Sequence, residues 1–302
     1  MDGVALVVGE ALIDVVVAAD GSVVERPGGS AANAAVALSR LMRPVLLATS
    51  YGPDEHGRLL SEHLVESGVV LATEPHVVGR TSVARARVGA DGGATYDFDV
   101  VWALGPVTVD DVQVMHVSSL APVLEPGAAQ VLALVDRLAT TTVTYDLNVR
   151  PAITGTGPDV RARVERMAAR ADLVKASDED LAALWPEATE DTAVQGLLEL
   201  GAGSVVVTRG ATGAEWIWGR RRSDRVAVAA PAVDVIDTIG AGDTFGAGLL
   251  DAVWEHLGSR RLAGLDPEAR GAALTHAAAC AAVTVSRVGA DPPWRREVQT
   301  PT

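Results

Sequence analysis

Near its carboxyl end the sequence places an aspartate immediately after a glycine-rich turn, in the string Asp237-Thr-Ile-Gly-Ala-Gly-Asp243. The pattern predicts that a helix, 241–257, begins inside this string, so its first free N–H groups and the positive end of its dipole would form an anion site. Asp243 could accept a proton from a hydroxyl there while the amides hold phosphoryl charge, which is the arrangement that phosphoryl transfer requires. The amides in question belong to Gly240, Ala241 and Gly242.

Two other interpretations of this string compete with the catalytic one. Asp243 could simply complement the helix dipole as part of a helix cap. The run Gly240-Ala-Gly242 also resembles part of the Gly-x-Gly-x-x-Gly dinucleotide motif, which would make the chain a nicotinamide-dependent dehydrogenase. Here, however, the third glycine, Gly246, comes one residue late, and the downstream strand and acidic residue of a complete βαβ unit are missing.

A second glycine-rich stretch lies near the amino end, in Pro27-Gly28-Gly29-Ser30-Ala-Ala-Asn33. Paired glycines at a loop-to-helix junction would let a ligand lie against bare backbone. Asn33, one turn into the predicted helix, can both donate to and accept from sugar hydroxyls. On its own the stretch fits equally well as a helix start with Ser30 as its cap.

Together the two strings resemble the two signature regions of the PfkB carbohydrate kinases, and the resemblance covers nearly the whole chain. It implies a ribokinase-like three-layer α/β sandwich with a mostly parallel central sheet, a single domain over 1–302, and a small β-sheet lid. It further implies that Asp243 is the catalytic base and that the Gly-Ala-Gly amides form the anion hole. The sugar hydroxyls would be bound by Asp14, Gly28, Gly29 and Asn33.

Two further stretches resemble the sugar-binding side of fructokinases. The string Asp146-Leu-Asn148-Val-Arg150-Pro151 matches a fructokinase and 2-keto-3-deoxygluconate kinase pattern, at a strand's carboxyl end where open α/β sheets bind ligands. The string Tyr96-Asp-Phe98 lies in the expected lid. The resemblance therefore adds Phe98, Asn148 and Arg150 to the expected sugar contacts.

The resemblance also implies a nucleotide side to the site. The string from Thr208 to Gly213 resembles a turn that holds nucleotide phosphates, and 281–290 resembles the region that lines the adenine pocket. Asp237 and the Ile239 carbonyl would bind a monovalent cation, for which K+ is the candidate. The residues implied in binding ATP are Thr208, Gly210, Gly213, Ala279 and Val283.

The expected Mg2+ site departs from the family pattern. The family's Asn-x-x-Glu motif appears here as Ser177-Asp-Glu-Asp180, with Asp180 in the glutamate position. A shorter carboxylate acting through water is chemically reasonable, because Mg2+ keeps several of its waters. The same residues would equally form a helix cap with an acidic first turn.

Short apolar runs alternate with helical patterns through most of the chain, which favours a parallel sheet covered by helices on both faces. The predicted strands are 5–8, 45–48, 112–117, 143–145, 173–175 and 205–208. The predicted helices are 31–42, 55–67, 125–139, 159–170, 178–185, 190–200, 241–257 and 267–286.

Two stretches break this alternation and predict the lid. Residues 12–26 and 81–100 each read as a hairpin, turning at Asp20-Gly21 and at 91–93, with alternating polar and apolar residues. Ordinary edge hairpins are the alternative. A lid of this kind could pair with a second lid in a homodimer or close over its own site, and the sequence leaves both open.

The composition excludes several other classes of protein. The formal net charge of −14 argues against nucleic acid or an anionic membrane as a partner, and no apolar stretch is long enough to suggest a membrane span. Without a leader-like segment, a cytoplasmic location is expected. The lone Cys280 excludes an intramolecular disulfide, and the only lysine, Lys175, lies in no Walker-type string.

The expected function is therefore transfer of the γ-phosphoryl group of MgATP to a primary hydroxyl of a sugar, with fructose as the first candidate. Ribose, 2-keto-3-deoxygluconate or a nucleoside is the alternative acceptor. A catalytically silent sugar-binding protein on the same fold is the alternative from another class, although a pure binder has no need of Asp243.

Overall fold

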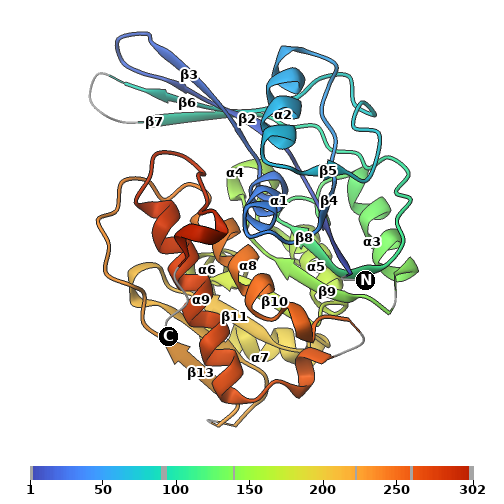
Figure 1. The fold of residues 1–302 in the computed structure, drawn as a ribbon, viewed down its shortest axis with the longest axis vertical. Coiled ribbons are helices and arrows are strands. Elements are labelled where there is room, and N and C mark those ends of the chain that lie inside the picture. Colours follow the sequence, from blue (N-terminus) through green and yellow to red (C-terminus); the bar gives the residue numbers. More distant parts are fainter. Residues whose placement is uncertain (1–2, 90–93, 139, 222, 259–260, 299–302) are drawn as a thin grey trace.

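A nine-stranded sheet forms the centre of the molecule in a computed structural model that describes residues 3–89, 94–138, 140–221, 223–258 and 261–298 (Figure 1). Its order is β13-β12-β11-β10-β9-β8-β1-β4-β5, and every neighbouring pair from β5 to β11 is parallel. The strands are β1 (Val4–Val8), β4 (Val45–Ala48), β5 (Val70–Leu71), β8 (Val112–Ser118), β9 (Thr142–Asp146), β10 (Leu173–Ser177), β11 (Val205–Thr208), β12 (Ala214–Ile217) and β13 (Arg225–Val228).

Helices cover both faces of this sheet, so the central strands are buried on both sides and are apolar almost throughout. One face carries α1 (Ser30–Arg40), α8 (Ala241–Ala252) and α9 (Pro267–Val285), and α2 (Glu55–Glu66) packs beside the lid. The other face carries α3 (Gly127–Arg137), α5 (Pro158–Ala168), α6 (Asp178–Leu184) and α7 (Glu190–Leu200), and a short α4 spans Pro151–Thr154.

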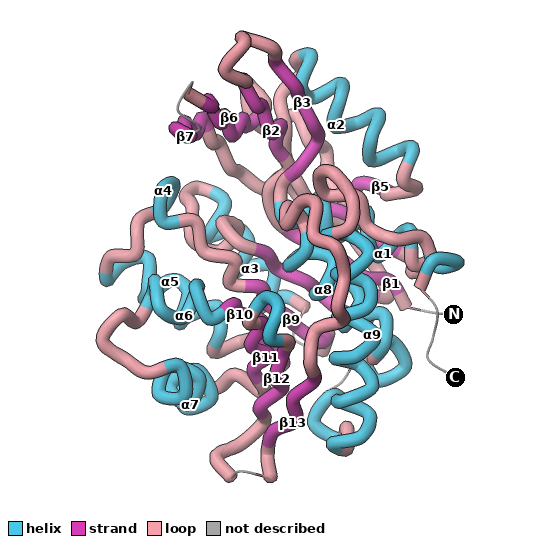
Figure 2. The backbone as a smooth tube through the Cα atoms, turned by 90° about the vertical axis from the view of Figure 1, so that its left-hand side faces the viewer, coloured by secondary structure: helices cyan, strands magenta, loops and turns pink. Residues whose placement is uncertain are grey.

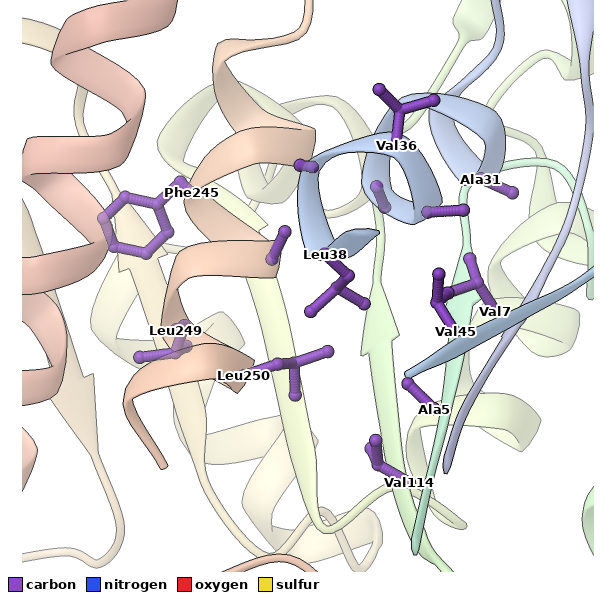
Figure 3. Close-up of a cluster of buried hydrophobic side chains, with 14 of the residues drawn as sticks. Ala5, Val7, Ala31, Val36, Leu38, Val45, Val114, Phe245, Leu249 and Leu250 are labelled. Carbon is purple, nitrogen blue, oxygen red and sulfur yellow. The ribbon is translucent and has the colours of Figure 1, made fainter. Parts of the chain in front are cut away.

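The core on the first face is built mainly from small and branched side chains, with a few aromatic ones. Figure 3 shows Leu38 of α1 and Leu250 of α8 directed towards Val7, Val45 and Val114 of the central strands. All five are at most 6% exposed. Burial of apolar surface stabilises the fold by about 25 cal/mol per Å², so these contacts hold both α1 and α8 on the sheet. The two helices are thereby fixed relative to each other.

The sheet changes winding direction at β1. The chain passes from β1 to β4 on one side and returns on the other side with β8, β9, β10 and β11. In open α/β sheets a ligand crevice lies outside the carboxyl ends of the strands at such a switch point. The residues that follow those ends are Glu10 after β1, Ser119 after β8 and Asn148 after β9.

A second sheet of four strands forms the lid, in the order β3-β2-β6-β7. The outer pairs are antiparallel hairpins, and β2 and β6 join the two hairpins in parallel. Figures 1 and 2 show this sheet at one end of the molecule, with β13 and α7 towards the other. The strands are β2 (Leu12–Val17), β3 (Val23–Gly28), β6 (Ser82–Val88) and β7 (Ala94–Asp99).

The α/β class, the mostly parallel sheet and the small lid sheet predicted from the sequence are confirmed, and the six predicted strands of the main sheet end within two residues of the expected positions. The turn expected at 91–93 lies outside the described residues. Three strands, β5, β12 and β13, were not predicted, and the helix expected at 241–257 ends at Ala252 before a separate 3-10 turn, Trp254–His256. None of the described helices is long and apolar enough to cross a membrane.

Candidate active site

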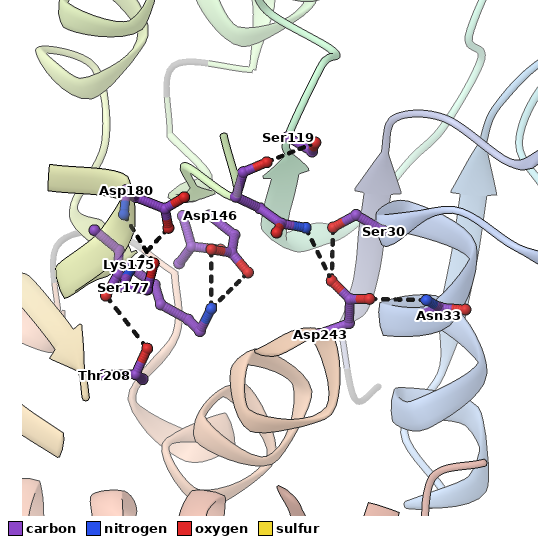
Figure 4. Close-up of polar contacts among 12 residues, drawn as sticks. Ser30, Asn33, Ser119, Asp146, Lys175, Ser177, Asp180, Thr208 and Asp243 are labelled. Carbon is purple, nitrogen blue, oxygen red and sulfur yellow. Dashed lines mark hydrogen bonds and ion pairs between the residues drawn. The ribbon is translucent and has the colours of Figure 1, made fainter. Parts of the chain in front are cut away.

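Asp243 lies in the first turn of α8, and its carboxylate is held by donors from two other segments (Figure 4). Oδ1 accepts a hydrogen bond from Ser30 Oγ at 2.7 Å and a longer one from Asn148 Nδ2 at 3.4 Å. Oδ2 accepts from Asn33 Nδ2 at 2.8 Å. The side chain is 6% exposed, so these charge-assisted contacts are strong and fix the direction of the carboxylate.

The turn before α8 presents its backbone N–H groups as the sequence predicts, with one adjustment. Gly240 is the N-cap in the left-handed region (φ 74°), and a Cβ there would lie 2.6 Å from that of Ala290. The N–H of Ala241 donates to the carbonyl of Thr238 at 3.2 Å. Among the described residues, the N–H groups of Gly240, Gly242 and Asp243 donate to no backbone carbonyl, so these amides are available to an anion.

A buried ion pair lies directly beneath this turn. The Nζ of Lys175, on β10, donates to both carboxylate oxygens of Asp146 at the end of β9, at 2.9 and 2.8 Å. A Cβ on Gly242 would lie 3.4 Å from Nζ, and one on Gly246 would lie 3.8 Å from Cδ of the same lysine. Two glycines one helical turn apart therefore make room for a cation under the anion site.

The sequence predicted no role for this pair, although the signal was present. Lys175 is the only lysine of the chain and stands in an apolar strand, where a charged side chain is rarely buried without a partner. Here Lys175 is 6% exposed and Asp146 1%. Burial raises the pKa of Asp146 to about 6, and the Lys175 charge opposes that rise.

The sugar side of the predicted site is formed by the lid and the start of α1. Asp14 lies on β2, and its carboxylate packs against Gly28, where a Cβ would collide with Oδ2. Gly29, at φ 98°, leads directly into α1 and Asn33. Burial raises the pKa of Asp14 to about 6, with Arg150 lowering it and the Asp243 charge raising it.

The register of the lid aligns several of these side chains in one row. Arg26 pairs with Asp14, Asp14 with Ala84, and Ala84 with Phe98. Directly opposed residues in a sheet share one face, so Phe98 lies on the same face as Asp14, two strands away. Asp14 and Arg26 also line a hollow together with Ile239, next to the α8 turn. Phe98 stacks on Tyr96 with ring centroids 6.3 Å apart.

Asn148 and Arg150 reach the site from the end of β9. Asn148 has a left-handed backbone (φ 37°), its carbonyl accepts from Ser119 Oγ at 3.0 Å, and its side chain points to Asp243. Arg150 is exposed, and its guanidinium donates to the carbonyls of Asn148 and Val149. Its charge acts on both Glu10 and Asp14. The geometry thus brings both predicted residues to the site.

Asp180 forms the helix cap that was the alternative to a metal role. Its Oδ2 accepts from the N–H of Ser177 at 2.8 Å, and the Oγ of Ser177 accepts from the N–H of Asp180 at 3.0 Å, which makes a capping box at the start of α6. Its Oδ1 accepts from the N–H of Val149 at 2.7 Å. The cap uses one lone pair of each carboxylate oxygen, so each oxygen keeps one further acceptor position.

Asp237 ties together the two loops beside the α8 turn. Its Oδ1 accepts from the N–H of Ile239 at 3.0 Å, and its Oδ2 accepts from the N–H of Gly289 at 2.8 Å. Within the described residues, no cluster of three or more His, Cys, Asp or Glu side chains forms a metal-binding group.

The predicted nucleotide residues lie on two separate elements. Thr208 ends β11, and the turn that follows needs left-handed glycines at Gly210 (φ 50°) and Gly213 (φ 110°). A Cβ on Gly213 would collide with the carbonyl of Val228. Ala279 and Val283 are half-buried and four residues apart, so they share one side of α9.

Glu10 is a further site residue that the sequence did not indicate. It follows β1, is 4% exposed, and its Oε1 accepts from the N–H of Ser30 at 3.2 Å, while its buried Oε2 accepts from no other residue in the described part of the chain. Burial raises the pKa of Glu10 to about 7, the Arg150 charge lowers it, and the Asp243 charge raises it.

Residues 4–296 match the model of the pfkB family of carbohydrate kinases. The chain belongs to this family. It is 34% identical to a fructokinase of Rhizobium leguminosarum bv. trifolii over 277 residues, which are 86% of this chain and 83% of that protein. The PfkB resemblance expected from the sequence is therefore confirmed, and the chain is a carbohydrate kinase.

Solved fructokinase structures share the whole architecture of this pfkB-family chain. A fructokinase from Xylella fastidiosa with bound ATP has a TM-score of 0.84 at 26% identity, covering 99% of this chain and 97% of that one. A double-mutant fructokinase from Vibrio cholerae O395, with fructose, ADP and potassium ion bound, has a TM-score of 0.80 at 25% identity, covering 96% and 94%.

Proposed function

We propose that the chain is an ATP-dependent fructokinase in which Asp243 is the general base. The observation that supports this most is the carboxylate of Asp243, held by Ser30 and Asn33 at the start of α8, beside two N–H groups that have no partner in the described chain. The similarity to fructokinases, one with ATP bound and one with fructose and ADP bound, supports the choice of substrates.

In this mechanism the sugar lies between the lid and the start of α1. The Asp14 carboxylate accepts hydrogen bonds from its hydroxyls, and the Gly28–Gly29 backbone exchanges hydrogen bonds with them. The attacking primary hydroxyl replaces one of the hydrogen-bond donors to Asp243. Asn148 is the donor displaced, because its contact is the longest and weakest of the three. As the hydroxyl oxygen bonds to phosphorus its proton passes to Asp243, a general-base contribution of about 10²–10⁴. The two remaining donors, Ser30 and Asn33, keep the carboxylate aimed during this transfer.

The positive potential at the transferred phosphoryl group comes from the chain in two ways. The N–H groups of Gly242 and Asp243 face it with the positive end of the α8 dipole. Lys175 is paired with Asp146, and its ammonium places the positive end of this neutral ion pair under Gly242. In the low dielectric of a buried site such a fixed dipole acts more strongly than in water.

Two cations are part of the proposal. Mg2+ would be held through water by Asp180, whose remaining lone pairs and neighbouring strand ends suit a hydrated ion, and when bound it neutralises charge on the nucleotide phosphates. K+ would be held beside the Asp237–Gly289 contact by the Asp237 carboxylate and the Ile239 carbonyl. The residues named for both ions supply oxygen atoms, the ligand type that a hard cation such as Mg2+ takes in proteins.

The test is a coupled assay of ADP release over a panel of sugars, with the wild type and Asp243→Asn. Fructose should give the highest kcat/KM, and the variant should lose at least two orders of magnitude in kcat with little change in sugar affinity. Asp159→Asn, in the exposed first turn of α5, is the matched control and should keep full activity. Near-normal turnover in Asp243→Asn would remove Asp243 as the base, and no response to any sugar would favour a silent sugar-binding protein.

A further inference from the structure

Both of the short hydrogen bonds to Asp243 come from the first turn of α1. Ser30 is its first residue and Asn33 its fourth, and they hold Oδ1 and Oδ2 of Asp243 at 2.7 and 2.8 Å. The orientation of the carboxylate therefore depends on where α1 begins. A contact that fixes the start of α1 therefore also fixes the orientation of the Asp243 carboxylate.

The start of α1 lacks the usual cap. Its N-cap is Gly29, which has no side chain to accept from the first N–H groups of the helix. A side chain is also excluded there, because Gly29 has φ 98° and a Cβ would lie 2.6 Å from the carbonyl oxygen of Glu10. The acceptor comes instead from Glu10, whose Oε1 takes the N–H of Ser30 at 3.2 Å from 20 residues away in the chain.

We propose that Glu10 is a positioning residue for the catalytic base, acting through Ser30. Glu10 holds the backbone of Ser30, the hydroxyl of Ser30 holds Oδ1 of Asp243, and the contact chain joins the end of β1 to the start of α8. This inference rests on the proposed function in one respect, that Asp243 is the catalytic base.

Stability alone does not account for a carboxyl group at this position. Glu10 is 4% exposed, forms no ion pair among the described residues, and its buried Oε2 accepts no hydrogen bond from any other described residue. Burying a carboxyl group with one oxygen unsatisfied is costly, and a neutral amide would accept from Ser30 at lower cost. We therefore attribute the buried carboxyl group to a role in orienting the site residues.

The electrostatic surroundings of Glu10 make its role depend on pH. The charged groups that act on it are Arg150, which favours its ionised form, and Asp243, which opposes it. The Glu10 charge also acts on the hydroxyl of Tyr145, on β9, which is buried without a hydrogen-bond partner among the described residues. Because an ionised acceptor forms the stronger hydrogen bond, the hold on Ser30 tightens as Glu10 loses its proton.

A double-mutant cycle on kcat tests the route through Ser30. Glu10→Leu removes the acceptor at similar size, and Ser30→Ala removes only the hydroxyl. Each single variant should lower kcat roughly tenfold with both KM values within about threefold, and the double variant should lose no more than either single one. Glu10→Gln keeps an acceptor oxygen and should retain at least about a third of the wild-type kcat near pH 7.

Two further measurements separate positioning from simple helix capping. The ratio of wild-type kcat to that of Glu10→Gln should rise as the pH increases from 6 to 8, which a structural cap would not cause. Asp266→Leu removes the cap of α9, whose Oδ1 accepts from the N–H of Ala269 at 2.7 Å, and should lower thermal stability without changing kcat.

The following outcomes would overturn the proposal. An unchanged kcat in Glu10→Leu, or additive losses in the double variant, would exclude action through Ser30. If Glu10→Leu does not fold, full activity in Ser30→Ala would exclude it instead. An inactive wild type would refute the proposed function, and the contact chain would then be tested in a crystal structure of Glu10→Gln. There the Ser30–Asp243 contact should persist, and it should lengthen beyond 3.5 Å in Glu10→Leu.

Discussion

Replacing Lys175 with methionine would remove the cation beneath the anion site while keeping an unbranched side chain of similar length. The substitution leaves Asp146, 1% exposed, without its bidentate partner. Breaking a buried ion pair from one side costs about 3–5 kcal/mol, because the remaining charge is desolvated and unpaired. At roughly 2 °C per kcal/mol for a chain of this size, the melting temperature should fall by about 6–10 °C.

The pH sets the size of this loss. Burial already raises the pKa of Asp146 to about 6, and Lys175 is the main influence that opposes the rise. Without Lys175 the pKa of Asp146 increases further, so the variant can protonate Asp146 and avoid the buried charge. The difference in stability between wild type and variant should therefore shrink as the pH falls from 8 towards 5.

The assay compares thermal melts and kcat for Lys175→Met, Asp146→Asn and the double variant. The double variant should recover most of the lost stability, because no unpaired charge remains. It should not recover activity, since in the proposed mechanism the ammonium lies beneath the anion site, and losing one preorganised electrostatic group of that kind costs about 10²–10³ in kcat. Wild-type stability in Lys175→Met, or restored turnover in the double variant, would refute this account of the pair.

Three other predictions follow from the site. Gly28→Ala should raise the KM for the sugar at least about tenfold and leave that for ATP unchanged, because the added Cβ collides with Asp14; equal effects on both would contradict this. Because the pKa of Glu10 is raised on folding, its protonated form adds to the free energy of unfolding. This contribution is fully present below about pH 4.5 and is lost as the pH rises through 7, a decrease of about 3 kcal/mol at most. Melts of Glu10→Gln should accordingly decline less between pH 5 and 8 than those of the wild type. The Asp180→Ala variant should require a higher Mg2+ concentration for half-maximal activity. An unchanged Mg2+ dependence would exclude a metal role and leave Asp180 only its part in the helix cap.

The sequence was sufficient for elements and positions that depend on local pattern. The apolar strands and the two hairpins follow from periodicity and turn residues, and the glycine-rich strings located both helix starts that meet at Asp243. The strands β12 and β13 were missed because they carry charged and aromatic residues in short runs without a clear alternation.

Contacts between distant segments could not be predicted in the same way. No local signal shows that β2 pairs in parallel with β6, although this pairing places Phe98 in the row of Asp14. The role of Glu10 depends on the end of β1 meeting α1, and the Lys175–Asp146 pair depends on two adjacent strands ending at one level. Burial and partners of these groups are properties of the assembled fold.

The position of the only lysine also has a practical consequence. Lys175 is 6% exposed and bound to Asp146, so an acylating reagent that attacks amines meets no open lysine side chain on the folded enzyme. Modification of Lys175 then requires the sheet and α8 to separate, and its rate reports how often they do. Slow acylation, accelerated by denaturant and retarded by nucleotide, would make this residue a built-in probe of opening at the anion site.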